Sequence, residues 1–125
     1  MGEDLRELLK TAEEDLKTAK DLYVLGNYRY ACFFAQQSVE KFLKAFLLYK
    51  EGSYPFTHDI TLLIKMCSRY DDDFLYLKEI KADGLDMFYT GVRYPPILDV
   101  TEEEAREALK IAEKVRDFIR RKLSL

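Results

Sequence analysis

One histidine is present in the chain, and it lies in the polar turn Thr57-His58-Asp59-Ile60. Imidazole changes its charge near neutral pH, so His58 could contact a phosphate or move a proton during attack by a ribose hydroxyl. In the other interpretation, His58 lies in the first turn of a helix and bonds to backbone or to a carboxylate such as Asp59. Spacing alone favours this structural role.

A second group that could do chemistry is the tripeptide Arg93-Tyr94-Pro95. The arginine could hold a phosphate in a fork geometry while the tyrosine stacks on a base. The alternative is that Arg93 pairs with carboxylates across the fold and that Tyr94 packs over a loop. The residues themselves leave these two alternatives evenly matched.

A nucleotide site needs cations for the phosphates and an aromatic wall for the base. Arginine and lysine would supply the cations, tyrosine would supply the wall, and histidine would lie nearby as a donor. The predicted ligand-binding residues are Arg93 with Lys41 or Lys44, Tyr89 or Tyr94, and His58.

Several common kinds of site are absent from the sequence. The five glycines are scattered at predicted helix ends and turns, which leaves no glycine-rich phosphate loop. One histidine and two separated cysteines do not make a zinc set, and no serine lies in a nucleophile-elbow pattern. We therefore predict neither a metal site nor a cofactor.

Positive charge is concentrated near the C-terminal end of the chain. Cations there complement the dipole of a terminal helix and need no ligand, which is the interpretation that we favour. The alternative is that they bind an acidic partner or RNA. These cations are Lys114, Arg116, Arg120, Arg121 and Lys122.

Apolar residues that recur every three or four positions predict two long helices in the first half of the chain. The first covers about residues 4–25, and Gly26 follows it where a left-handed cap belongs. The second covers about residues 28–50, is apolar on much of its circumference, and ends before Gly52. Such a helix needs neighbours on several sides, so we place it at the centre of a bundle, antiparallel to the first.

Three more helical segments are predicted in the second half. Thr57 can cap a third helix over about residues 58–69, and a further piece covers about residues 73–89 with a bend near Gly84. Thr101-Glu102-Glu103-Glu104 is a capping box that starts a last helix, which continues to about Lys122. No strand-like alternation is present. The predicted fold is all-α, an up-and-down four-helix bundle with an additional short helix.

The composition restricts what this chain can be. It has 125 residues, of which 48% are hydrophobic and 34% charged, which is typical of a single helical domain over residues 1–125. The net charge of -3 argues against constitutive non-specific binding of nucleic acid. One asparagine and two glutamines among many Lys and Glu residues indicate a thermophile.

The predicted environment is the cytoplasm. Cys32 and Cys67 both fall on predicted helices, and we expect them to be reduced core residues, with a disulfide as the minority alternative. The N-terminal segment has no continuous apolar run, so we expect neither a signal peptide nor a membrane anchor, and no stretch is apolar enough to span a bilayer.

Taken in order along the chain, these segments resemble the HEPN domain family, and the resemblance covers nearly the whole chain. It implies an up-and-down helical bundle, a homodimer and a link to nucleotides or RNA. It also implies a minimal nucleotidyltransferase partner, a similarity to the C-terminal helical domain of kanamycin nucleotidyltransferase and, in some pairs, toxin and antitoxin roles. The resemblance is carried by Gln36-Gln37-Ser38-Val39-Glu40-Lys41, Leu43-Lys44-Ala45, Thr57-His58-Asp59-Ile60, Arg93-Tyr94-Pro95 and the helix over 101–119.

The chain departs from the family pattern at one point. Ribonuclease members carry an arginine that is followed after four to six residues by a histidine. After Arg93 the corresponding positions hold Leu98, Asp99 and Val100, and no arginine stands at that distance before His58. The departure argues against a ribonuclease built on that motif.

We therefore expect a homodimeric, HEPN-type module that binds a nucleotide or a partner, best matched to a minimal nucleotidyltransferase. Apolar residues such as Phe33 and Leu22 would contribute to the dimer face. One alternative is a divergent ribonuclease toxin with His58 and Arg93 as its catalytic residues. The other is a structural dimer without a ligand.

Overall fold

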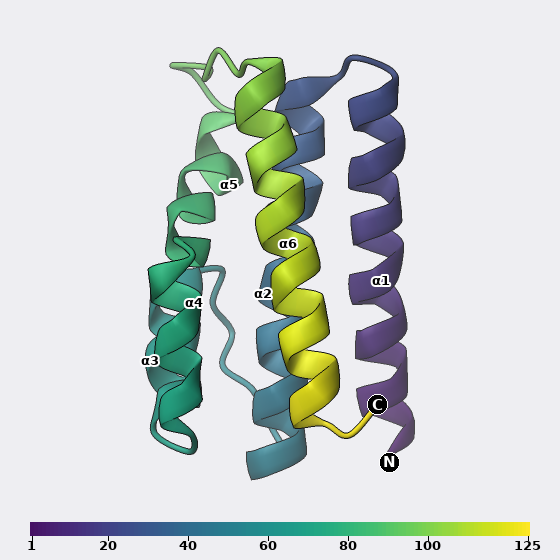
Figure 1. Cartoon of the computed structure of the whole chain (residues 1–125), viewed down its shortest axis with the longest axis vertical. Helices are drawn as coiled ribbons and strands as arrows, with labels where there is room; N and C mark the ends of the chain where they lie inside the picture. The colour runs from purple at the N-terminus through teal and green to yellow at the C-terminus, as the bar shows by residue number, and fades with distance from the viewer.

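The computed structural model describes all residues of the chain, 1–125, and contains helices, turns and loops but no strand. Three long helices, α1 (Glu3–Val24), α2 (Tyr28–Glu51) and α6 (Glu102–Lys122), run along the length of the molecule (Figure 1). The remaining side is occupied by α3 (Ile60–Ser68) and a series of short pieces. These are η1 (Asp72–Leu75), α4 (Tyr76–Glu79), η2 (Ala82–Asp86) and α5 (Met87–Gly91). The predicted all-α bundle with an additional short helix is confirmed.

Helix α2 is the central element, as its apolar circumference predicts. It contacts α1, α3, α5, η2 and α6. The side chain of Asn27 caps its start by accepting from the Tyr30 amide, and Gly52 ends it in the left-handed conformation with φ 80°. Its fully buried side chains include Phe42, Leu43 and Phe46. Burial on several sides leaves few positions on α2 where a polar side chain can reach a partner, and these positions define the site below.

Helix α3 begins two residues later than predicted. Asp59 is its N-cap and accepts a hydrogen bond from the Leu62 amide at 3.1 Å. Thr57 instead accepts from the Asp59 amide at 3.2 Å, which shapes the turn before the helix. A carboxylate is an excellent N-cap, and here it competes successfully with the threonine hydroxyl. His58 therefore lies in the loop before α3, and the prediction that it lies in the first turn of a helix is wrong.

The segment predicted as one bent helix over residues 73–89 consists of four short pieces. The helical run is broken at Lys81, which has φ 64°, and not at Gly84. A left-handed residue ends a helix, and here it brings both Leu77 and Leu85 into the core. The break places α5, with Tyr89, at the end of the bundle where the loop before α3 passes.

Two other features match expectation. Cys32 and Cys67 are both buried and free, and burial raises the pKa of the Cys32 thiol to about 12. The predicted capping box is present at the start of α6. The Thr101 hydroxyl accepts from the Glu104 amide, and the Glu104 carboxylate accepts from the Thr101 amide. None of the helices is both long enough and apolar enough to cross a lipid bilayer.

Candidate functional site

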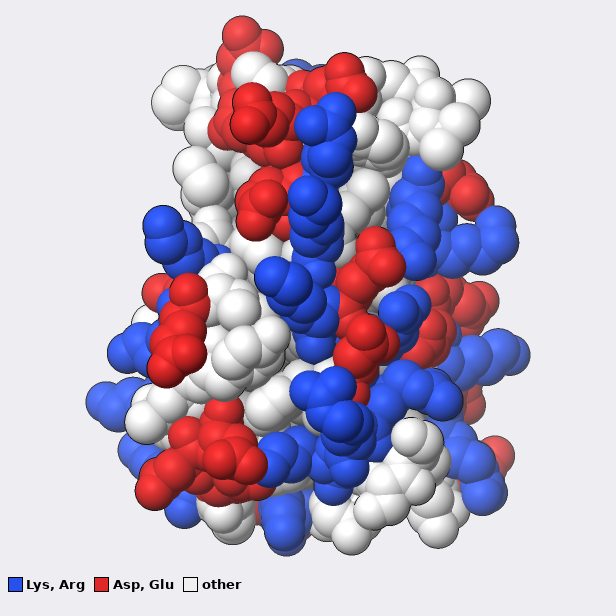
Figure 2. All heavy atoms as spheres, in the orientation of Figure 1, with Lys and Arg blue, Asp and Glu red and all other residues white.

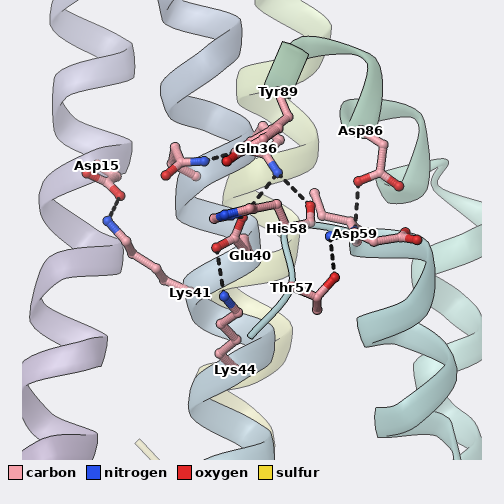
Figure 3. A network of polar contacts seen from close by, with 12 residues as sticks. Asp15, Gln36, Glu40, Lys41, Lys44, Thr57, His58, Asp59, Asp86 and Tyr89 are labelled. Carbon is pink, nitrogen blue, oxygen red and sulfur yellow. Dashed lines mark hydrogen bonds and ion pairs between the residues drawn. The ribbon is translucent and has the colours of Figure 1, made fainter. Parts of the chain in front are cut away.

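The site is built on three polar side chains of α2 that follow one another at four-residue intervals, Gln36, Glu40 and Lys44. This spacing places them on one side of the helix, where all three are buried. The Glu40 carboxylate accepts from Lys44 Nζ at 3.0 Å and from Gln36 Nε2 at 3.4 Å. Figure 3 shows this row pointing toward the loop that carries His58.

His58 is held in place by two of these residues. Its Nδ1 lies 3.0 Å from Glu40 Oε1, and its backbone oxygen accepts from Gln36 Nε2 at 3.2 Å. A carboxylate in its ionised form can only accept, so with that form of Glu40 the donor is Nδ1. Nε2 makes no hydrogen bond within the chain, and 45% of the side chain is exposed. The buried glutamate therefore fixes the ring and leaves Nε2 without a partner in the chain, an arrangement that suits a general acid or base.

Tyr89 of α5 lies against the imidazole and connects it to Arg93. The His58 and Tyr89 rings are stacked, with centroids 4.2 Å apart and planes at 18°. The Arg93 guanidinium carbon lies 4.6 Å from the Tyr89 centroid and 4.9 Å from that of Phe33. We call His58, Tyr89 and Arg93 the aromatic stack. His58 and Arg93, 35 positions apart in the sequence, thus contact the same ring.

Arg93 is exposed and forms no salt bridge with any carboxylate of the chain. Its Nε donates to the Tyr89 carbonyl oxygen at 3.1 Å, which orients the guanidinium along the stack. One interpretation of Arg93 was that it pairs with a carboxylate across the bundle, and this pairing does not occur. Tyr94 is 58% exposed, and its ring centroid lies 5.5 Å from the guanidinium carbon.

The two lysines proposed to assist Arg93 are both paired with carboxylates. Lys41 Nζ contacts Asp15 of α1 at 2.5 Å, on the far side of α2 from His58 (Figure 3). Burial raises the pKa of the Asp15 carboxyl, although its bond with Lys41 opposes this effect. Lys44 does belong to the site, but Glu40 neutralises its charge and only 9% of its side chain is exposed. Neither lysine lies free beside Arg93, because the helical spacing turns one toward α1 and the other toward Glu40.

An open hollow of about 590 Å³ borders the other side of His58. Asp86 reaches across it and accepts from the Ile60 amide at 2.7 Å and from the Thr61 hydroxyl at 2.9 Å. Burial raises the pKa of the Asp86 carboxyl. The hollow is lined by Thr57, His58, Asp59, Thr61, Asp86, Tyr89 and Thr90. Its two carboxylates disfavour an anion there, so a phosphate would bind on the Arg93 side of the stack.

Sequence reasoning missed Gln36, Glu40, Phe33 and Asp86 as parts of this site. Polar residues four apart at positions 36, 40 and 44, on a helix that is apolar on much of its circumference, were a usable signal for the first two. No comparable signal marked Asp86, whose role depends on how the short pieces fold back. No group of three or more His, Cys, Asp or Glu side chains is arranged to hold a metal ion.

Comparison with known proteins gives a consistent result. A family model described as "HEPN domain" matches residues 5–122. The chain is 31% identical over 139 residues to the Methanocaldococcus jannaschii protein "Putative toxin MJ1304", covering 94% of this chain and 89% of the relative.

Two solved structures are also similar to this chain. The crystal structure of TT1696 from Thermus thermophilus has a TM-score of 0.80 and 32% identity, covering 97% of this chain and 99% of that one. The crystal structure of ST0689, described as an archaeal HEPN homologue, has a TM-score of 0.74 and 28% identity, covering 98% of both chains.

Proposed function

Because the chain belongs to the HEPN domain family, we propose that it is the HEPN component of a toxin–antitoxin type pair and that it binds nucleotide phosphate at the aromatic stack. The similarity to a relative named as a toxin supports the first part. The second part rests on one observation, an exposed and unpaired Arg93 guanidinium on the same tyrosine ring as His58.

In this proposal the phosphate is bound between Arg93 and the free Nε2 of His58. Guanidinium binds phosphate oxygens in a fork. Because stacking on Tyr89 and Phe33 already restricts Arg93, its side chain loses little conformational freedom when a phosphate binds. The base would stack on Tyr94, the exposed ring at the end of the stack. Glu40 keeps His58 in position and does not contact the ligand.

Calorimetry with ATP tests the binding proposal. The variant Arg93→Gln should bind about tenfold more weakly or worse, because it loses a charge-assisted hydrogen bond. The matched control is Arg6→Gln, since Arg6 is an exposed arginine of α1 without a salt bridge. Binding that is equally strong in Arg93→Gln and wild type would remove the assignment.

The protein partner that we propose is a minimal nucleotidyltransferase, as the family resemblance implies. An affinity pull-down from the native source, with the bound proteins identified by mass spectrometry, tests this. Recovery of a small nucleotidyltransferase in near-stoichiometric amount supports the pair, and an empty chain or unrelated proteins would contradict it. Coexpression of the recovered partner should then relieve any growth arrest that the chain causes alone.

We also propose that the chain is a homodimer through a face that includes Leu22 and Phe33. Leu22 is half-buried, Phe33 is partly covered by Arg93 and Tyr89, and Val24 and Leu25 nearby on the chain are about four-fifths exposed. Apolar side chains this exposed favour a protein contact. Light scattering at several concentrations should give twice the chain mass. A monomer throughout would refute the proposal.

The second candidate function is a divergent ribonuclease, and the specific observation in its favour is the contact between Glu40 and His58 Nδ1. His58 Nε2 could accept the proton of a ribose 2′-hydroxyl while Arg93 stabilises charge on the phosphate. His58→Gln and Arg93→Ala should each abolish cleavage of an oligoribonucleotide, and the 2′-deoxy analogue should stay intact. Cleavage that survives both substitutions would end this candidate.

A further inference from the structure

The short pieces η1 to α5 run beside α6 (Figure 1). Two hollows lie where these pieces meet α6, and we call this surface the groove. The upper one has a volume of about 190 Å³ and is lined by apolar Leu85, Phe88 and Ile111, together with Gly84. The lower one has a volume of about 380 Å³ and is lined by Tyr76, Phe118 and Arg121, among others.

One face of α6 forms the wall of both hollows. The α6 residues that line them recur at steps of three, four or seven positions and include two adjacent pairs. This spacing places them on one side of the helix. Lys114 falls on this same face between the two hollows, seven residues before Arg121. The lining residues of α6 are Glu104, Glu107, Ala108, Ile111, Phe118, Arg121 and Lys122.

Positive charge that the chain does not neutralise lies on this wall and beside it, from the middle of α6 to its C-terminal end. Lys110, Lys114 and Arg121 are exposed and form no salt bridge. Across the lower hollow, Asp73 is already bound by Lys122 at 2.5 Å. Figure 2 shows a column of Lys and Arg side chains down the face over α6, with both acidic and uncharged side chains beside it. Like charges four residues apart weaken a helix slightly, so the pair at 110 and 114 does not help the fold.

We propose that this groove binds an acidic amphipathic helix of a partner protein, at a site separate from the aromatic stack. An apolar helix face would fill the hollows over Phe118 and Ile111, as in other helix-in-groove complexes. Carboxylates four residues apart on the partner rise by about 6 Å along its axis, the same step as from Lys110 to Lys114. Complementary charges of this kind direct association and fix the register of the helix.

A nucleic acid fits this groove less well than a protein helix. A phosphate backbone presents continuous negative charge. Here Glu107 is three residues before Lys110, Glu113 directly precedes Lys114, and the whole chain carries a net charge of -3. A helix can place its few carboxylates opposite Lys110, Lys114 and Arg121 and keep other residues beside the two glutamates.

The test uses a labelled synthetic helix of about five turns with Leu and Phe on one face and Glu beside them, followed by fluorescence anisotropy. The double variant Lys110→Glu/Lys114→Glu should weaken its binding about tenfold or more. The control Lys10→Glu/Lys65→Glu changes the net charge equally at two exposed lysines without salt bridges, and its affinity should match wild type.

A steric variant gives an independent result. A Cβ added at Gly84 meets no atom within 4 Å and its backbone is not left-handed, so Gly84→Tyr should fold and place its ring in the upper hollow. It should weaken binding of the acidic helix, and circular dichroism should show an unchanged bundle.

Four outcomes would overturn the proposal. These are equal affinity for a probe with Lys in place of Glu, equal binding to the charge-reversed double variant, unchanged binding to Gly84→Tyr, and preferential binding of oligouridylate in the groove. Arg93→Gln should leave the probe affinity unchanged, and Lys110→Glu/Lys114→Glu should leave ATP binding unchanged. The groove and the aromatic stack can therefore fail separately.

Discussion

Replacing Glu40 by leucine should be one of the most damaging single changes outside the apolar core. Glu40 has 5% of its side chain exposed and neutralises Lys44, which has 9% exposed. Glu40→Leu conserves the approximate volume but leaves the ammonium group buried without a counter-charge. It also removes the acceptor for His58 Nδ1 and Gln36 Nε2.

The size of the effect follows from the burial of the pair. Removing one partner of a buried ion pair costs about 3 to 5 kcal/mol, because the remaining charge stays desolvated. A domain of this length has a free energy of unfolding of roughly 6 to 19 kcal/mol. The variant should therefore lose a large part of its stability, and its melting temperature should fall by roughly 10 to 20 °C.

Urea unfolding followed by far-ultraviolet circular dichroism measures this effect. The double variant Glu40→Leu/Lys44→Met removes both charges and should recover most of the loss, to within about 1 kcal/mol of wild type. If Glu40→Leu alone stays within about 1 kcal/mol of wild type, Lys44 is not desolvated and the reasoning fails. If the double variant is as unstable as the single one, the loss comes from the hydrogen bonds of Glu40 and not from the stranded lysine.

Three further predictions concern other parts of the bundle. The Lys122 hydrogen bond lowers the pKa of the Asp71 carboxyl below its ordinary 3.8, so Asp71 stabilises the fold above that pH and this contribution is lost as the pH falls through its folded value. Lys122→Met should therefore be less stable than wild type near neutral pH, and this difference in unfolding free energy should shrink in acid. Urea unfolding across the acid range measures it, and a difference that stays constant would contradict the prediction. Burial raises the pKa of the Cys32 thiol to about 12, and it raises the pKa of the Cys67 thiol as well. Neither thiol should therefore react with a thiol reagent at about pH 8 until urea unfolds the chain. Fast labelling of the native protein would contradict this. Thr101→Ala removes the hydroxyl of the capping box and should cost about 1 kcal/mol in urea unfolding, with Thr18→Ala, a substitution within α1, as the control.

Local patterns in the sequence were sufficient for most of the helices. Apolar spacing, Gly52 and the capping box at Thr101 predicted α1, α2 and α6 to within a few residues, since short-range periodicity and capping decide where a long helix starts and ends. Between residues 57 and 91 the same patterns placed α3 to within two residues, but they missed its cap and the break into short pieces after it. There Asp59 competes with Thr57 as the cap, and Lys81 takes up a left-handed conformation that no local signal favours.

The sequence by itself determined the helical class, the central place of α2 and the candidates His58, Arg93, Tyr94 and Tyr89. Only the tertiary structure decided that Tyr89 joins His58 to Arg93, that Glu40 holds the histidine, and that Lys41 and Lys44 are paired with Asp15 and Glu40. The physical reason is that a periodic pattern reports which side of a helix is apolar, whereas the partner of each polar side chain depends on how loops and short helices, distant in sequence, are packed against that helix.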